Sequence, residues 1–218
     1  MDSPSLIKPK QQRSQQTQDK LIAALQFYLR DKFFEHISIK ELTAHANVSV
    51  GTFYRRFKSK ESLLPLLYQD FGRDLEAWLF AIEQEDTSDL KNIVSKLCSR
   101  TYTFFNERKG VFRTLHLNSR LHSDLLTSDK NNDRRRIYQR MAHLLATQMS
   151  SATTCLPAQN ASNAKTQAQA EMAVFIMINA LLDKVVYKNL TPAIATELEG
   201  EAFVQELEHV LLCYLGSA

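Results

Sequence analysis

Hydrophobic residues recur every three or four positions along most of this sequence, which is the spacing of one face of an α-helix. In the first such run, Leu21, Leu25 and Tyr28 form a single apolar stripe. The pattern predicts an all-α fold in which two short helices are followed by several long ones. The expected helices run from Thr17 to Asp31–Phe34, over 39–46 and 50–57, from Ser59 through Trp78, and over 88–108, 110–117, 124–149, 166–189 and 192–215.

Local signals mark where several of these helices begin and end. Ser38 and Glu41 have capping-box spacing, and Ser49 is placed to cap the third helix. Asn47 occupies the turn between the two short helices, and asparagine tolerates the left-handed conformation that such a turn needs. Thr191 and the proline after it are typical of a helix start. Two short helices joined by a tight turn form a helix-turn-helix, so the N-terminal helices are predicted to form a three-helix head.

Composition divides the chain into three parts. Residues 1–16 are polar and rich in glutamine, which predicts a disordered arm. Residues 17–62 form the predicted helix-turn-helix domain, and residues 63–218 form a second helical domain. Within the latter, residues 150–164 are rich in Ser, Thr, Asn and Ala and are expected to form a loop. The chain has only 5 Gly and 5 Pro, which agrees with helices rather than a turn-rich β fold.

Positive charge is concentrated at the N-terminal end. Residues 1–60 contain 11 Lys and Arg against 5 Asp and Glu, whereas the whole chain contains 27 against 24. Contacts to nucleic-acid phosphates need clustered cations. A modest local excess more often marks a solvated basic surface, however. The charge distribution is therefore compatible with a nucleic-acid-binding head but does not establish one.

Several other classes of protein leave no signal in the sequence. It contains no apolar run of about 18 residues and no signal-peptide core, which indicates a cytoplasmic protein that does not cross a membrane. Cys98, Cys155 and Cys213 lack disulfide or zinc spacing, and the six His show no ligand pattern, so no metal or other cofactor is expected. No paired acids and no nucleophile with a base appear, which disfavours an enzyme or carrier with an incidental helix-turn-helix.

The segment 39–64 is the most informative part of the chain. Its apolar positions, which include Phe53 and Phe57, have the spacing needed to pack two helices that cross at a steep angle. An outer face of small, hydroxyl and arginine side chains suits a helix lying in a major groove of DNA. The residues left on that outer face are Val50, Gly51, Thr52, Tyr54, Arg55 and Arg56.

The stretch VSVGTFYRRFKSKESLL, residues 48–64, resembles the N-terminal signature of the tetracycline-repressor (TetR) family. The likeness covers about Leu21 to Leu67, and beyond that it is one of architecture only. It implies a homodimeric DNA-binding regulator, commonly a repressor, that grips double-stranded operator DNA and is released by an effector bound in its C-terminal domain. It also implies that Phe53 and Phe57 are core residues, and that Gly51, Thr52, Tyr54 and Arg55 face DNA while Lys60 contacts a phosphate.

Three positions depart from the family pattern. Phe33 stands where the family has a glycine after the first helix, so the first connection is expected to take a different path. Asn47 replaces the glycine of the turn, and Arg56 replaces a common His or Tyr and adds a cation toward DNA. None of these changes removes the motif. The full set predicted to contact DNA is Ser38, Thr43, Ser49, Val50, Gly51, Thr52, Tyr54, Arg55, Arg56 and Lys60.

The last two predicted helices have the character of an interface. The segment Met172–Leu182 is apolar nearly all round, which is too much for a helix with one wet face. Two such helices in each subunit would make a two-fold four-helix contact, which the resemblance identifies with the family's dimer interface. On the final helix the expected interface stripe is Phe203, Leu207, Val210 and Tyr214.

Aromatic and methionine side chains in the second domain are compatible with either a plain core or a ligand cavity. Helical spacing favours a core position for each one alone, whereas the resemblance favours a cavity for the region. A mostly hydrophobic effector is the expected ligand, and control by a protein partner is the alternative. The predicted lining is Trp78, Phe104, Phe105, Met141 and Phe175, with His116, Tyr138 and Asn179 as polar groups that orient the ligand.

Overall fold

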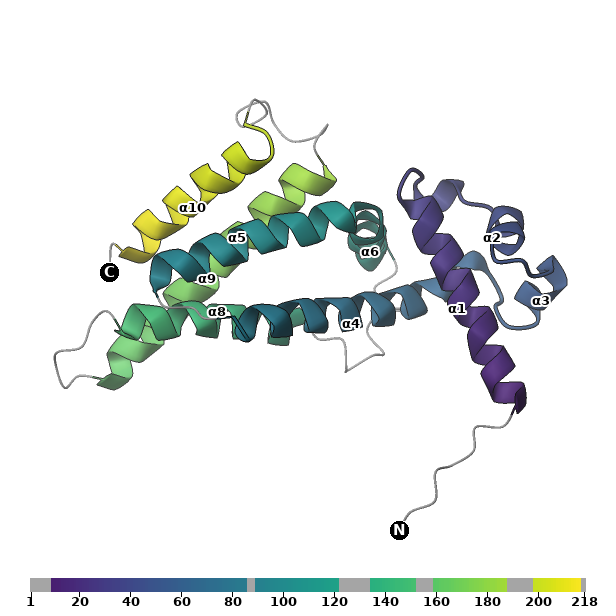
Figure 1. Cartoon of the computed structure of the whole chain (residues 1–218), viewed down its shortest axis with the longest axis horizontal. Helices are drawn as coiled ribbons and strands as arrows, with labels where there is room; N and C mark the ends of the chain where they lie inside the picture. The colour runs from purple at the N-terminus through teal and green to yellow at the C-terminus, as the bar shows by residue number, and fades with distance from the viewer. Residues whose placement is uncertain (1–8, 86–88, 122–133, 152–158, 188–197, 217–218) are drawn as a thin grey trace, which may run out of the picture. The chain divides into compact units, whose positions relative to one another are not determined.

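The computed structural model describes residues 9–85, 89–121, 134–151, 159–187 and 198–216. Within these ranges the regular structure is entirely helical, which confirms the all-α prediction (Figure 1). The α-helices are α1 (Pro9–Leu29), α2 (Ile39–His45), α3 (Val50–Tyr54), α4 (Leu64–Glu83), α5 (Leu90–Glu107), α6 (Lys109–Leu121), α8 (Arg134–Ser151), α9 (Gln159–Val186) and α10 (Glu201–Gly216), with short 3₁₀ helices at Phe34–His36 and Lys60–Leu63.

The chain divides into two compact units. The N-terminal unit comprises Met1–Phe71 and Gly110–Ser128, and the C-terminal unit comprises Gly72–Lys109 and Asp129–Ala218. The N-terminal unit therefore extends past the predicted boundary at residue 62 and includes α6. Helix α4 is continuous through residue 71, so it contributes residues to both units.

The core of the N-terminal unit is built from the apolar stripe that the sequence predicts. Leu21 and Leu25 of α1, Leu42 of α2 and Phe53 of α3 have no exposed surface. Each such side chain contributes about 1.5–3 kcal/mol when it leaves water. Helix α2 packs against both α1 and α3, so this core fixes the helix-turn-helix (Figure 1).

Two helices begin earlier than the sequence predicts. Helix α1 begins at Pro9, so residues 9–16 are helical rather than part of a disordered arm. Proline is favoured in the first turn of a helix, and glutamine and lysine are good helix formers, so a Gln-rich composition is compatible with a helix. Helix α9 begins at Gln159, inside the predicted loop, in a run rich in alanine. The last helix begins at Glu201, and the start signal predicted at Thr191 lies outside the described residues.

The connection after α1 accommodates Phe33 without a left-handed residue. Phe33 has an extended backbone, with φ −74° and ψ 149°, and precedes the 3₁₀ helix at Phe34–His36. The centre of its ring lies 3.9 Å from the guanidinium carbon of Arg113 in α6. Arg113 also donates a hydrogen bond to the carbonyl of Lys32, at 2.8 Å. The connection after α1 is therefore held by the Phe33 ring and by Arg113 of α6, without a residue in the left-handed region.

Helix α6 approaches the end of α1 so closely that only glycine fits. A Cβ atom added at Gly110 would lie 1.7 Å from the carbonyl oxygen of Leu29. Farther along α6, the carbonyl of Leu115 accepts a hydrogen bond from the Tyr68 hydroxyl of α4, at 2.6 Å. These contacts make α6 part of the N-terminal unit.

The Gly110→Ala variant should lower the free energy of unfolding by about 2 kcal/mol, because backbone rather than a flexible side chain must move to admit the methyl group. Chemical denaturation of the purified variant measures this loss. Gly216→Ala is the matched control, since nothing lies within 4 Å of a Cβ added there. Equal stability of Gly110→Ala and the wild type would contradict the close approach of α6 to α1.

Candidate DNA interface and ligand pocket

Helix α3 owes its start to Ser49 and the turn before it. Asn47 has φ 53°, which confirms the left-handed turn expected of an asparagine at this position. The Ser49 hydroxyl then accepts a hydrogen bond from the Thr52 backbone N–H, at 3.1 Å, and shares a second with the Thr52 hydroxyl, at 2.9 Å. This cap begins a helix of only five residues with Phe53 buried beneath it.

The outer face of α3 is as exposed as the sequence predicts. Val50 is 42% exposed and Tyr54 is 57% exposed. Gly51 is also exposed, and a Cβ added to it would meet only the Ser49 hydroxyl, at 3.9 Å. Packing within the chain therefore gives no reason for a glycine at position 51. A smooth surface that lets another molecule approach the backbone closely would explain it.

Two arginines border this face and are already oriented. Arg55 donates to the Thr52 hydroxyl at 2.8 Å. Arg56 donates to the backbone carbonyl of Ser14 in α1, at 2.9 Å, and to the Ser14 hydroxyl. Both guanidinium groups remain exposed. Since each has five N–H donors, these bonds leave capacity for a phosphate or a base edge.

Helix α2 carries the capping box that its sequence predicts. The Ser38 hydroxyl accepts from the Glu41 backbone N–H at 3.2 Å, and the Glu41 carboxylate accepts from the Ser38 backbone N–H at 2.8 Å. Lys32 donates to the same carboxylate at 2.6 Å. The hydrogen bond from Lys32 and those from Ser38 lower the pKa of Glu41 to about 2. Ser38 is exposed, so its position permits DNA contact, although its hydroxyl is already bonded to Glu41.

Thr43 does not have the surface position predicted for a DNA contact. It is 2% exposed, and its hydroxyl donates to the carbonyls of Ile39 and Lys40 in its own helix. On so short a helix, the spacing of hydrophobic residues in the sequence does not distinguish the buried Thr43 from its exposed neighbours. The structure therefore assigns Thr43 to packing rather than to DNA contact.

Lys60 bonds within the chain in this structure, and its phosphate contact stays a prediction. Its ammonium group donates to the carbonyls of Phe34, Glu35 and Ile37, at 2.6, 3.1 and 2.9 Å. It also lies 4.6 Å from the centre of the Phe34 ring. Burial lowers the pKa of Lys60, partly opposed by nearby carboxylates. An ammonium has three N–H donors, so these three bonds use all of them and tie the 3₁₀ helix at Lys60–Leu63 to the first connection.

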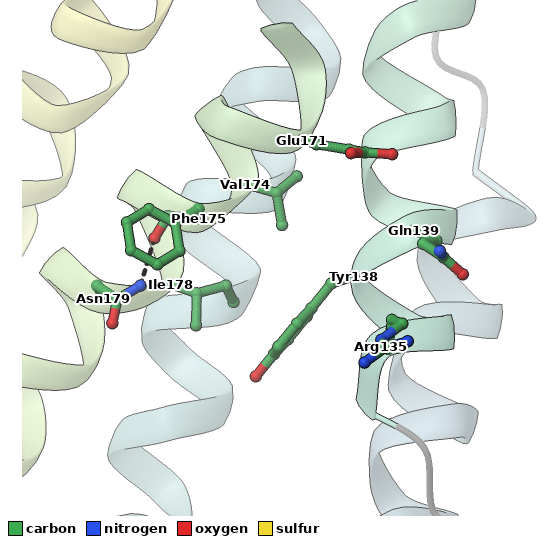
Figure 2. Close-up of a pocket in the computed structure, with 8 residues that line it drawn as sticks. All are labelled: Arg135, Tyr138, Gln139, Glu171, Val174, Phe175, Ile178 and Asn179. Atoms are coloured by element: carbon green, nitrogen blue, oxygen red, sulfur yellow. Dashed lines mark hydrogen bonds between the residues drawn. The ribbon is translucent and has the colours of Figure 1, made fainter. Parts of the chain in front are cut away.

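A pocket of about 540 Å³ lies between α8 and α9 in the C-terminal unit (Figure 2). Tyr138 extends from α8 toward Val174 and Ile178 of α9, and the Asn179 amide donates to the Phe175 carbonyl at 2.7 Å. Three predicted pocket residues meet here: Tyr138, Phe175 and Asn179. The lining residues that the sequence reasoning missed are Arg135, Gln139, Glu171, Val174 and Ile178. The spacing of the α9 residues, at i, i+3, i+4, i+7 and i+8, was the available signal.

The other five predicted pocket residues do not join this pocket. Met141 and Phe105 are 0% and 2% exposed and belong to the core. Trp78 stacks on Phe104, with ring centroids 5.3 Å apart, and the two line a separate surface hollow. His116 belongs to the N-terminal unit. These residues therefore do not form the single cavity that was predicted. The neighbours Phe104 and Phe105 on α5 show the reason, because Phe105 is buried in the core whereas Phe104 lines the surface hollow.

Arg140 fastens α8 to α4 directly beside the pocket. Its Nε and Nη2 atoms donate to the two carboxylate oxygens of Glu83, at 2.9 and 2.5 Å, and Nη1 donates to Glu76 at 2.5 Å. These bonds, those to Glu83 above all, raise the pKa of Arg140. Since Tyr138 and Gln139 line the pocket, the pocket wall and the ion pair lie on one turn of α8.

Helices α9 and α10 expose large apolar side chains. Met172, Phe175, Val210 and Tyr214 are 48%, 63%, 54% and 38% exposed. Leu207, predicted on the same stripe, is only 7% exposed and packs inside the chain. A substitution there would disturb the core as well as any interface, so it cannot serve as a test of dimerisation.

The described residues also bear on the predictions about metal ions, membrane helices and cysteines. Within them, no group of three potential metal-binding side chains occurs, and no helix is long and apolar enough to cross a membrane. In the described part of the chain Cys98 and Cys213 form no disulfide, and burial raises the pKa of Cys98 to about 12. Cys155 lies outside the described residues.

Residues 30–67 match the family model described as "Bacterial regulatory proteins, tetR family". They include α2, α3 and the capped turn between them, which is the region whose geometry forms the exposed face. The chain carries a TetR-family DNA-binding domain. No curated protein matches the sequence.

Solved structures of TetR-type regulators share the fold over nearly the whole chain. A TetR-like transcriptional regulator from Rhodococcus sp. RHA1 is 17% identical, with a TM-score of 0.59 over 94% of this chain and 97% of that one. A second regulator from the same organism is 18% identical, with a TM-score of 0.60 over 92% and 94%. FadR from Bacillus subtilis, solved in complex with stearoyl-CoA, is 15% identical, with a TM-score of 0.56 over 94% and 99%. At these identities the likeness establishes the TetR fold alone.

The Glu41→Gln variant should show a stability deficit that depends on pH. The pKa of Glu41 is lowered in the folded chain from its ordinary value of 4.5 to about 2, so its contribution is complete above pH 4.5 and is lost as the pH falls toward 2. The difference in Tm between wild type and Glu41→Gln should therefore be largest near neutral pH and close to zero near pH 2. Thermal unfolding at a series of pH values measures it.

Glutamine retains the capping geometry, so this variant removes only the charge and its pairing with Lys32. Glu35→Gln makes the same change of charge at an exposed position of the first connection and is the control. A Tm difference between wild type and Glu41→Gln that is constant from pH 7 to about 2 would show that the carboxylate's charge adds nothing to folding.

Proposed function

We propose that this protein is a transcriptional regulator that binds double-stranded operator DNA through α3. The observation that carries the proposal is the exposed face of α3, on which Gly51 has no packing role and Tyr54 is largely solvent-exposed. The excess of Lys and Arg in residues 1–60 supports it, since phosphate contacts dominate affinity for DNA.

The side chains of α3 divide naturally between positioning and sequence recognition. The Tyr54 hydroxyl and the Arg56 guanidinium suit phosphate contacts, which fix orientation but carry no sequence information. Arg55, which is held by Thr52, suits a bidentate contact with a guanine edge in the major groove. Val50 and Gly51 let the front of the helix approach the bases. Ser38 and Ser49, both exposed, complete the proposed contact set.

Dimerisation through α9 and α10 is the second part of the proposal. Helices α9 and α10 pack together, and Gln169 donates to the Tyr214 carbonyl at 2.6 Å. Both expose apolar side chains that a second copy would cover, as in an isologous two-fold interface. Such a dimer presents two heads to half-sites about one helical turn of DNA, or a multiple of it, apart.

We infer that the α8–α9 pocket holds a largely hydrophobic effector whose binding releases DNA. Val174, Phe175 and Ile178 supply apolar walls. The long-chain acyl thioester bound by FadR from Bacillus subtilis supports an effector of this class. Phe175 lines the pocket and also belongs to the exposed face of α9, so a ligand that moves its ring alters the proposed dimer face. Such a ligand switches the protein only if it binds the two states with different affinity.

Control by a protein partner is the alternative. A thermal-shift screen against lipophilic cations, acyl thioesters and antibiotics separates the two. A hit that raises Tm and weakens operator binding supports the small effector. A docking partner that weakens operator binding, with no such hit, supports the alternative.

Tyr54→Ala and Arg55→Ala should each weaken operator binding about fivefold or more, because each removes about 1–3 kcal/mol of DNA contact. Both side chains are exposed, so Tm should stay close to the wild-type value. Fluorescence anisotropy with DNA fragments that the protein retains from its source genome measures the affinity. The affinity should also fall steeply with salt concentration, since several phosphates are neutralised.

Lys91→Ala removes an exposed cation from α5 and is the matched control, for which unchanged affinity is expected. Lys60→Met should instead lower Tm, because the three carbonyls that it bonds lose their donor. If both α3 variants bound operator DNA with full affinity, or if binding did not depend on salt, α3 would not be the DNA-recognition helix.

Val210→Arg should convert the dimer to a monomer of about half the mass, because it places a charge in the apolar face of α10. Light scattering after size exclusion, at micromolar protein concentration, measures the mass. Gln205→Arg introduces the same charge at an exposed position about 140° around the helix from Val210 and should remain dimeric. A wild-type protein of 25.0 kDa in solution would refute the dimer.

A further inference from the structure

A second cavity in the C-terminal unit differs in chemistry from the α8–α9 pocket. It has a volume of about 410 Å³ and lies where α5 and α9 end and where the chain enters α10. It shares no lining residue with the α8–α9 pocket. Its lining is Tyr102, Asn106, Lys109, Lys184, Val185, Glu199 and Gly200.

Two lysines bring positive charge to this cavity. Lys184 of α9 is 7% exposed, which is rare for a lysine, and its ammonium lies 5.3 Å from the centre of the Phe203 ring. Lys109, at the start of α6, is partly buried. A buried ammonium is stable only when polar or charged groups surround it. The single carboxylate in the lining, that of Glu199, is exposed and balances one of the two charges.

The remaining polar groups of the lining include hydrogen-bond donors. Tyr102 and Asn106 are one turn apart on α5 and contribute a hydroxyl and an amide. Gly200 has φ 55°, and a Cβ added there would lie 3.7 Å from the Tyr102 hydroxyl. A side chain at position 200 would therefore strain the backbone and fill the space beside that hydroxyl. Glycine keeps this part of the cavity open.

We propose that this cavity binds a small oxyanion, namely a molecule that carries a carboxylate or phosphate group. Two ammonium groups, a hydroxyl and an amide supply charge-assisted and neutral donors, which is the set that such an anion needs. The residues that line the cavity carry two ammonium groups and one carboxylate, so their formal charge favours an anion. The site does not depend on the proposed binding of DNA, because it is built entirely within the C-terminal unit.

Calorimetric titration with inorganic phosphate, and separately with citrate, tests the proposal at constant ionic strength set with sodium chloride. The full-length protein should bind at least one of them with a Kd of about 1 mM or tighter. Lys184→Met, which retains the apolar stem, should weaken that binding at least tenfold. Lys91→Gln removes an exposed cation from α5 outside the cavity and should bind as the wild type does.

Asn106→Leu provides a second variant in case Lys184→Met fails to fold, because Asn106 is exposed on α5. It should also weaken binding of the anion. Binding of phosphate alone assigns a phosphate site, and binding of citrate alone assigns a carboxylate site. Failure of both anions to bind, or equal binding by the wild type and both cavity variants, would overturn the proposal. Operator binding would be unaffected by that failure, which separates this proposal from the previous one.

Discussion

Burial of Phe53 is the interaction on which the proposed DNA interface depends. A helix of five residues has no stability of its own in water, since helix nucleation costs more than so few hydrogen bonds return. Phe53 is fully buried and points away from Val50, Gly51 and Tyr54. The apolar side chain therefore holds α3 against the core while the polar cap at Ser49 sets where the helix begins. Every residue of the exposed face takes its direction from these two constraints.

The N-terminal unit also shows why the likeness to the TetR family predicts the roles of some residues better than those of others. A position on a motif predicts where a backbone lies, but a long side chain can reach several partners from there. Lys60 reaches three carbonyls of the first connection, whereas the resemblance implied a phosphate. These three carbonyls belong to the connection in which Phe33 lies, so Lys60 ties this connection to the 3₁₀ helix at Lys60–Leu63.

Sequence periodicity predicted the helices of the N-terminal unit well because each has a dry and a wet face. The predicted ranges of α2 and α3 end one and three residues beyond the observed helices, whereas both short helices start where their caps place them. Periodicity was less informative where composition is polar, as at the start of α1, because helix formers and disordered segments share Gln, Lys and Ser. The pocket was harder still. Trp78, Met141 and Phe175 all have helical spacing, and only tertiary packing decides which of them is core and which borders a cavity.

Helix α8 places the proposed effector site next to a rigid element of the fold. Tyr138 and Gln139 line the pocket, and the next residue, Arg140, holds Glu76 and Glu83 of α4. A ligand that displaces α8 must either carry α4 with it or separate Arg140 from its carboxylates. Breaking these partly exposed ion pairs costs free energy, although solvent screening makes the cost smaller than for a fully buried pair. Movement of α4 with α8 is therefore the lower-energy response. The ion pair therefore couples the proposed effector site to α4, whose residues from Gly72 onward belong to the same C-terminal unit.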